Sequence, residues 1–165
     1  MDLDSALTGK PADGAGATEL LRADHREVSG LFDEYTRARG AGQTRGVIAQ
    51  TIAMQLELHD AIESEVFYPA IEERASELVE SAMEAHADIA RLVDALKDED
   101  DDKQRDDLVT RLKAAVEAHV REEEGALFPR VETIGAEALR ALAQEMVKRK
   151  EELTRSTETF EGPAT

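Results

Sequence analysis

The residues best suited to chemistry in this sequence stand in two similar stretches, HDAIESEVFYPAI and HVREEEGALFPRV. The first begins at His59 and the second at His119, and each has a glutamate four residues later, Glu63 and Glu123. On a helix this spacing puts the imidazole and the carboxylate one turn apart on the same face, where both can reach one ion. Imidazole nitrogen together with carboxylate oxygen suits iron, manganese or zinc, so the two stretches indicate a metal site.

A second pair of similar stretches lies upstream and carries the other two histidines. His25 opens HREVSGLFD and His86 opens HADIARLVD. The chain is therefore a tandem pair, in which a segment with one histidine precedes a segment with His-x-x-x-Glu, and all four histidines belong to this scheme. Each histidine alone would be an ordinary hydrogen-bonded core residue. Four imidazoles and two carboxylates in one core layer, however, are costly to bury without a metal.

The choice of Glu123 over its neighbours Glu122 and Glu124 rests on the first stretch. There the glutamate stands four residues after the histidine, and Ile62 occupies the position three residues after it. The carboxylate common to both stretches is therefore the one at plus four. We expect the remaining acids, Glu65 and Glu124, to face solvent.

Apolar residues at helical spacing predict the elements that position these side chains. Long amphipathic helices are expected over residues 18–39, 44–73, 76–97 and 105–131, each with one histidine on its apolar stripe. Short connections between them predict an all-α fold, an antiparallel up-down-up-down four-helix bundle with an additional C-terminal helix over residues 136–155. Thr18 is expected to cap the first helix.

Three further details follow from the same periodicity. Pro69 is expected to bend the last turn of the second helix, and Ala70 and Ala126 are placed on the inward stripes of their helices. The predicted organisation is a disordered N-terminal arm at residues 1–17, the helical bundle at 18–156 and a loose C-terminal tail at 157–165. The acidic run at 98–102 lacks the spacing of a calcium loop and is expected to be a solvated connection.

Composition narrows the classes of function. The chain has 165 residues, which suits one domain, and a formal net charge of −17, which disfavours nucleic acid and anionic membranes as partners. It contains no cysteine, which excludes disulfides, iron–sulfur clusters and thiolate zinc sites. No apolar run approaches the ~18 residues of a membrane span, and no secretion signal is recognisable, so a cytoplasmic protein is expected.

The histidine and His-x-x-x-Glu segments resemble bacterial hemerythrin-like domains of the HHE cation-binding family, over about residues 18–155. The resemblance implies a non-haem di-iron centre whose metal ligands are His25, His59, Glu63, His86, His119 and Glu123. It also implies that both carboxylates bridge the irons together with an oxo or hydroxo group. Members of the family are linked to oxygen or iron sensing, to peroxide or nitric oxide chemistry, and to iron handling.

Two departures from the oxygen-carrying members of the family are visible. Those carriers have a fifth histidine one turn from the ligand on the third helix, where this chain has Ala82 and Ala90 on either side of His86. They also use an aspartate as one bridge, where this chain has Glu123. Both departures disfavour reversible oxygen transport.

The tandem symmetry and the resemblance together assign two histidines to each iron. His25 and His59 would hold one ion, and His86 and His119 the other. With two bridging glutamates and a bridging oxide or hydroxide, each iron then has five ligands and one open position. Adjacent open positions favour cleavage of an O–O bond over reversible oxygen binding, so catalase-like peroxide turnover is the preferred hypothesis.

The tyrosines are not expected to bind metal. Tyr35 is about 15 Å along its helix from His25, and Tyr68 falls on the opposite face of a regular helix from His59. Phe67, Tyr68 and Phe128 are instead expected to pack at the end of the bundle.

Three functions are therefore under consideration. The first is a di-iron protein that binds or turns over hydrogen peroxide, O2 or NO. The second is a non-enzymatic oxygen or iron sensor, or an iron-handling protein. The third is a helical module with a structural metal such as zinc. Metal content and the visible spectrum would separate them.

Overall fold

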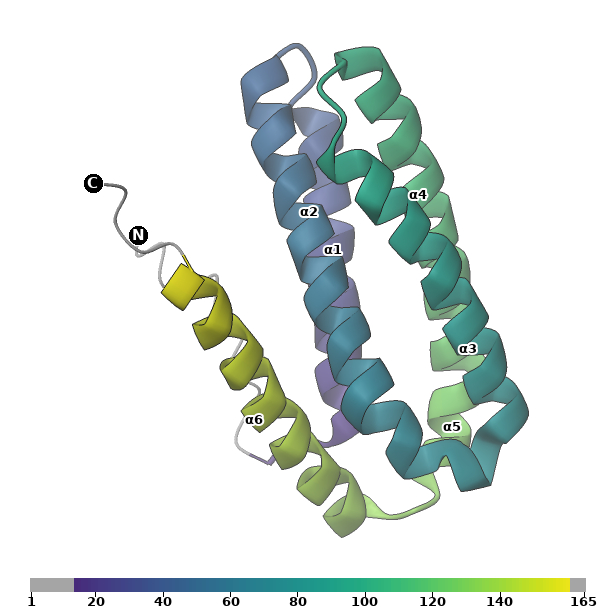
Figure 1. Cartoon of the computed structure of the whole chain (residues 1–165). Coiled ribbons are helices and arrows are strands. Elements are labelled where there is room, and N and C mark those ends of the chain that lie inside the picture. The colour runs from purple at the N-terminus through teal and green to yellow at the C-terminus, as the bar shows by residue number, and fades with distance from the viewer. Residues whose placement is uncertain (1–13, 161–165) are drawn as a thin grey trace.

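The computed structural model describes residues 14–160, with side chains described for residues 14–156, and every element in this part of the chain is helical. Figure 1 shows four long helices side by side and one further helix leaning against them. The elements in chain order are α1 (Ala17–Arg37), α2 (Gly42–Ile62), η2 (Glu63–Phe67), α3 (Tyr68–Lys97), α4 (Asp102–Glu122), η3 (Glu123–Leu127), α5 (Phe128–Glu132) and α6 (Ala136–Phe160). The predicted four-helix bundle with a C-terminal helix is confirmed.

The connections α1–α2 and α3–α4 lie at one end of the bundle, and the turn from η2 into α3 lies at the other (Figure 1). Gly40 makes the first connection with a φ of +86°, a conformation that glycine adopts without steric cost. Asp101 caps α4 by accepting a hydrogen bond of 2.9 Å from the backbone N–H of Gln104. Neighbouring helices in the bundle therefore run antiparallel, as the short loops predict.

Two π-helical turns, η2 and η3, occupy corresponding positions in the two repeats and begin at Glu63 and Glu123. In each, a backbone N–H donates to the carbonyl five residues earlier, from Tyr68 to Glu63 and from Phe128 to Glu123. The proline that follows each turn lacks an N–H and would clash with the carbonyl of a regular helix, so the wider turn accommodates it.

The extra residue in each π turn rotates everything that follows. Ala70 and Ala126, which regular periodicity places inward, are solvent-exposed, and those two predictions are wrong. The buried positions are instead Phe67 and Tyr68 in the first repeat, and Leu127 and Phe128 in the second. Pro69, predicted to bend the last turn of the second helix, follows the π turn η2 in the first turn of α3, and the chain continues helically until a break at Ala75 (φ −150°, ψ 37°). The predicted start of the next helix at residue 76 agrees with that break.

The apolar core is divided into two clusters. One fills the end of the bundle near the two loops and includes Phe32, Ile52 and Leu112. The other fills the opposite end and includes Leu21, Ile71 and Met146. The four histidines and the two glutamates of the predicted site belong to neither cluster, although all six are buried. Polar groups in the middle of the bundle are thereby shielded from water on both sides.

Helix α6 closes the second cluster by packing against α1, α2 and η2. Ala143 and Met146 are buried beneath it, and two of its cations contact the bundle: Arg149 donates to Glu65 at 2.5 Å, and Lys150 donates to Asp24 at 2.9 Å. No helix among the described residues combines the length and apolar character that a membrane span requires.

The N-terminal and C-terminal boundaries of the bundle differ in detail from the predicted ones. Thr18 does not cap α1; it lies inside the helix, buried, and its hydroxyl donates to Glu132 at 2.9 Å. Gly16 precedes the helix, and its N–H donates to Glu19 at 3.1 Å. The predicted N-terminal arm falls mostly on residues 1–13, outside the described residues. The predicted tail at 157–165 falls partly on α6 and partly outside them.

Candidate metal centre

The six predicted ligand residues come together in the middle of the bundle. They form two groups whose ligand atoms lie within 4.8 Å of one another: His25, His59, Glu63 and Glu123, and Glu63, His86 and His119. Because Glu63 belongs to both groups, they form one continuous site. Helices α1, α2, α3 and α4 supply one histidine each, and the first residues of η2 and η3 supply the carboxylates.

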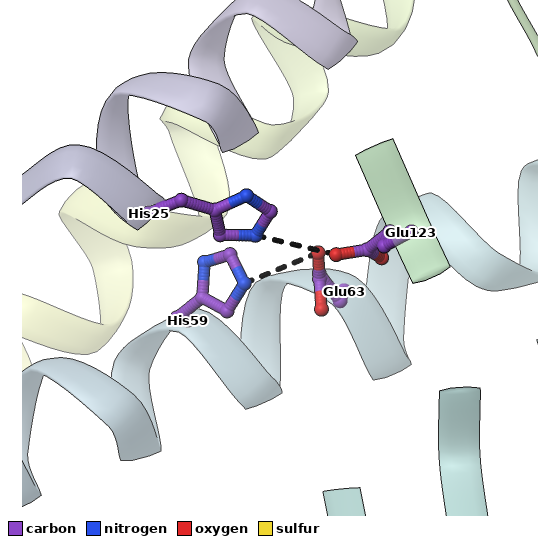
Figure 2. Close-up of side chains that lie close together, drawn as sticks. All are labelled: His25, His59, Glu63 and Glu123. Carbon is purple, nitrogen blue, oxygen red and sulfur yellow. Dashed lines mark ion pairs between the residues drawn. The ribbon is translucent and has the colours of Figure 1, made fainter. Parts of the chain in front are cut away.

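In the first group, the imidazoles of His25 and His59 lie side by side and point toward the carboxylates of Glu63 and Glu123 (Figure 2). His25 Nε2 lies 3.2 Å from Glu123 Oε2, and His59 Nε2 lies 3.2 Å from Glu63 Oε1. These four atoms are buried, and none has a hydrogen-bond partner among the described residues. Buried polar atoms are almost always satisfied. Four such atoms converging on one point are the donor set that a transition metal requires.

The second group is more compact. Glu63 Oε2 lies 2.9 Å from His86 Nε2 and 3.8 Å from His119 Nε2, and the two imidazole nitrogens are 3.0 Å apart. The two oxygens of Glu63 thus face different histidine pairs, which is the arrangement of a bridging carboxylate. Glu123 also spans the pairs, with Oε2 at 3.2 Å from His25 and 3.4 Å from His119. The donor set therefore fits a two-metal centre.

Tyr68 lies inside the site, and its predicted position on the opposite helical face is wrong. Its hydroxyl is 2.9 Å from Glu63 Oε2, 2.9 Å from Glu123 Oε1 and 3.1 Å from His86 Nε2. The side chain is only 2% exposed. The cause is η2, whose extra residue turns Tyr68 inward. Tyr35 is remote from the site, as predicted, and donates to Asp106 at 2.7 Å.

The position equivalent to Tyr68 in the second repeat is Phe128, and its contacts differ. The Phe128 ring stacks on His25 with centroids 5.9 Å apart, whereas the Tyr68 ring lies at 5.3 Å from His86. One end of the site therefore borders a hydroxyl group and the other an apolar ring. Phe67, Tyr68 and Phe128 are all predicted to pack at the end of the bundle. This prediction holds for Phe67 and Phe128, which are fully buried.

Carboxylates outside the ligand set contact the far nitrogen of three histidines. Glu124 lies 2.8 Å from His25 Nδ1, Asp60 lies 2.5 Å from His86 Nδ1, and Asp24 lies 3.4 Å from His59 Nδ1. Such partners fix the orientation of an imidazole and direct Nε2 toward the site. Glu65 faces solvent as predicted, but Glu124 is partly buried by its contact with His25.

The electrostatics of the site couple its acids and bases. Burial alone would lower the pKa of His59, but the negative charge of Glu63 and the contact with Asp24 raise it well above its usual value. Burial would also lower the pKa of His119, but Glu123 and Glu63 raise it to about 9. Burial would raise the pKa of Glu63, yet His59 and the other imidazoles hold it well below its usual range.

Tyr68 behaves differently, because burial and the charges of Glu63 and Glu123 all raise the pKa of its phenol. The hydroxyl therefore keeps its proton and can donate it to one carboxylate at a time. In the metal-free protein, protons on the imidazoles and on the Tyr68 hydroxyl therefore occupy the places where a metal ion would supply positive charge.

A pocket of about 220 Å³ lies beside the site and is lined by all four histidines. Ala90, one of the two alanines that stand one turn from His86, lines this pocket. Ala82 does not. It is buried in the second apolar cluster, beside Leu78 and Leu127. Room for a small molecule thus exists on one side of His86 only.

Sequence reasoning missed Tyr68, Asp24, Asp60 and Glu124. A signal for Tyr68 was available, because a proline follows an aromatic residue in the middle of an apolar pattern in both repeats. A proline there cannot fit a regular helix and indicates a change of register. The three supporting acids have no comparable signal, since acids next to a histidine are common on the polar faces of helices.

Comparison with known proteins identifies the family and supports the fold. The family model for the hemerythrin HHE cation binding domain matches residues 16–131, and it matches again over residues 83–165. A crystal structure of a hemerythrin HHE cation binding domain-containing protein from Mycobacterium kansasii is similar, with a TM-score of 0.76 and 24% sequence identity. The similarity covers 89% of this chain and 91% of that chain, and at this identity it shows the fold alone. No curated protein matches the chain.

Proposed function

Because the chain belongs to the hemerythrin HHE cation binding domain family, we propose that the candidate centre holds two iron ions. We further propose that the protein binds or turns over a small oxidant, namely hydrogen peroxide, O2 or NO, with catalase-like peroxide turnover favoured. The observation that carries this proposal is the set of four buried atoms on His25, His59, Glu63 and Glu123 that converge without hydrogen-bond partners.

In this proposal each iron is held by the two histidines of one hairpin. His25 and His59, whose rings lie 5.0 Å apart, would hold one ion, and His86 and His119, at 4.6 Å, the other. Glu63 and Glu123 would bridge. Manganese and zinc accept the same donors. Iron is preferred because carboxylates and imidazoles converge inside a helical bundle, the setting in which di-iron carboxylate proteins hold their metals, although those proteins use four carboxylates and two imidazoles.

Iron in this position would supply the electrons and the Lewis acidity that break an O–O bond. The residues of the chain would prepare the site for that reaction. Asp60, Asp24 and Glu124 orient the imidazoles, and the two apolar clusters pack on either side of the polar layer. The hydroxyl oxygen of Tyr68 lies 2.9 Å from an oxygen of each carboxylate, so its proton can stabilise either of them by a hydrogen bond.

Two features support turnover over reversible oxygen carriage. Ala90 stands where a further histidine could reach the site, and it borders the pocket instead. Tyr68 places a proton donor next to the carboxylates, and cleavage of an O–O bond consumes protons.

The proposal is tested by loading the protein with iron and measuring metal content, the visible spectrum and oxygen evolution from hydrogen peroxide. The expected result is near two irons per chain, an oxo-bridge absorption band and oxygen release. Glu123→Gln should abolish the release, because an amide cannot bridge two cations as a carboxylate does. The matched control is Glu122→Gln, since Glu122 is an exposed neighbour whose carboxylate accepts a hydrogen bond from Ser81.

Other outcomes would select the alternative functions. One zinc per chain and no colour would replace the proposal with a structural metal. Two irons without oxygen release, together with folding that depends on oxidation state, would favour a sensor or an iron-handling protein. A stable, reversible oxygen complex would overturn the preference for turnover.

A further inference from the structure

The pocket beside the site has a polar end and an apolar body. The four histidines line its buried end, and neither Glu63 nor Glu123 contributes to it. Its walls are aliphatic: Val28, Leu56, Ile89, Val93, Val116 and Val120. Glu57, Ala90 and Asp94 also line it and are exposed, so the pocket reaches the surface between α2 and α3. A molecule entering here would meet the site from the histidine side.

The size of the pocket exceeds what hydrogen peroxide needs. On this measure ~10–15 Å³ holds a water molecule, and an apolar cavity of ~150 Å³ binds benzene. The pocket, at about 220 Å³, can hold an aromatic ring with several further heavy atoms. Aliphatic walls gain little from a small polar molecule, whereas they favour a hydrocarbon group by the hydrophobic effect.

The mouth of the pocket selects by charge. Asp24, Glu57, Asp60 and Asp94 line the pocket, Glu57 and Asp94 at its exposed end, and the whole chain carries a formal net charge of −17. Lys150 and Lys97 contact Asp24 and Glu57, and they offset part of this charge. Asp24 and Asp60 also contact His59 and His86. The charge balance at the exposed mouth is therefore set by Glu57 and Asp94 against Lys97, and it disfavours an anion. The occupant that fits the walls and the mouth together is an uncharged molecule with an apolar group.

We propose that this pocket binds the organic group of a hydroperoxide, so that the substrate class of the site is an uncharged alkyl or aryl hydroperoxide. The peroxide end would reach the histidine layer while the hydrocarbon group packs against Val28, Ile89 and Val116. The assignment of the reactive end rests on the proposed function, whereas the binding of the apolar group rests on the pocket itself.

Binding is tested with an inert analogue, 2-phenyl-2-propanol, followed by calorimetry or ligand-observed NMR on the full chain. We expect a sub-millimolar Kd in the parent protein and at least tenfold weaker binding in Ala90→Leu, which extends a side chain into the pocket. Ala87→Leu adds the same atoms at an exposed position of α3 that does not line the pocket, and it should bind like the parent. Benzoate, similar in size but anionic, should bind at least tenfold more weakly than the alcohol.

An absence of binding to the parent, or equal binding to Ala90→Leu, would overturn the proposal. Ala90→Met repeats the comparison with a more flexible side chain if circular dichroism shows that Ala90→Leu is poorly folded. If benzoate binds as tightly as the alcohol, the pocket does not select against anions, and the assignment of an uncharged substrate fails.

Reactivity is tested separately with cumene hydroperoxide and ascorbate. One hydroperoxide gives one alcohol and one water as its O–O bond breaks, and one ascorbate is oxidised to dehydroascorbate. In the iron-loaded protein, Ala90→Leu should slow this reaction tenfold or more, whereas Ala87→Leu, which lies outside the pocket, should react like the parent.

The two experiments separate the two proposals. If the alcohol binds and neither peroxide reacts, the proposed function fails and the hydroperoxide assignment fails with it. If hydrogen peroxide reacts and the alcohol does not bind, only the pocket assignment fails.

Discussion

The hydroxyl of Tyr68 lies 2.9 Å from Oε1 of Glu123, a residue of the other repeat. The same hydroxyl is 2.9 Å from Glu63, so one phenol joins the two carboxylates that the halves of the chain contribute. Both carboxylates are almost fully buried, and in the metal-free protein each depends on such donors for its stability. This contact is therefore a sensitive place to test the site.

Tyr68→Phe should lower the free energy of unfolding of the metal-free protein by about 1–3 kcal/mol, because it leaves Oε1 of the buried Glu123 without its donor. The loss should be smaller in the metal-loaded protein, where the ions satisfy the same oxygens. Tyr35→Phe is the control, since it also removes a hydroxyl that donates to an acid, but one far from the site. Urea titrations measure all four values. Equal losses with and without metal would argue against a coupling between Tyr68 and the ligands.

Asp60→Asn should weaken metal binding about 10–100-fold, the usual effect of removing the carboxylate behind a ligating histidine. Asp60 lies 2.5 Å from His86 Nδ1, and the amide would hold the ring less firmly. Asp88→Asn, an exposed site on α3 whose acid pairs with Arg91, is the control. Competition with a chromophoric chelator gives both affinities. Unchanged affinity in Asp60→Asn would show that the contact does not position His86.

Stability should depend on pH in opposite senses without and with metal. The raised pKa of His119, about 9, stabilises the metal-free protein fully below pH 6.5, and this contribution is lost as the pH rises toward 9. The loss is on the order of 3 kcal/mol. The lowered pKa of Glu63 adds stability that is lost only as the pH falls below 4.5.

Metal affinity should rise over the same interval from pH 6.5 to 9, because each proton that leaves an imidazole frees a ligand. Unfolding of chelator-treated and metal-loaded protein at several pH values in this range measures both trends. A metal-free protein that becomes more stable from pH 6.5 to 9 would contradict the charge assignment of the histidines.

Removing one ligand should reduce the metal content sharply, and His59→Ala and His119→Ala test one histidine from each pair. Both variants should also lose the stabilisation that metal gives the parent, which is about 2.7 kcal/mol when free metal exceeds Kd a hundredfold. Elemental analysis and melting curves with and without a chelator are the measurements. Glu65→Gln, at a solvent-facing position of η2, should behave like the parent. Full iron content in both histidine variants would remove these residues from the centre.

The sequence was sufficient to predict the bundle and the convergence of His25, His59, Glu63, His86, His119 and Glu123, because helical periodicity and the repeat both constrain these positions. Periodicity failed where the helix itself changes. A π turn moves every later residue by about 100°, which exposed Ala70 and brought Tyr68 into the site. The roles of Asp24 and Asp60 could not be predicted for a different reason, because they depend on which helix lies next to each residue in space.

Tyr68 in the first repeat and Phe128 in the second occupy equivalent positions, and this difference affects the order in which metal ions bind. Two copies of one unit would by themselves create two equal sites, with no preference for which is filled first. Here the His86–His119 side has a phenol oxygen within 3.1 Å, and the His25 side has a stacked hydrocarbon ring. The halves thus offer chemically different surroundings, so one ion should enter before the other. A mixed pair of two different metals could then be assembled in a single orientation.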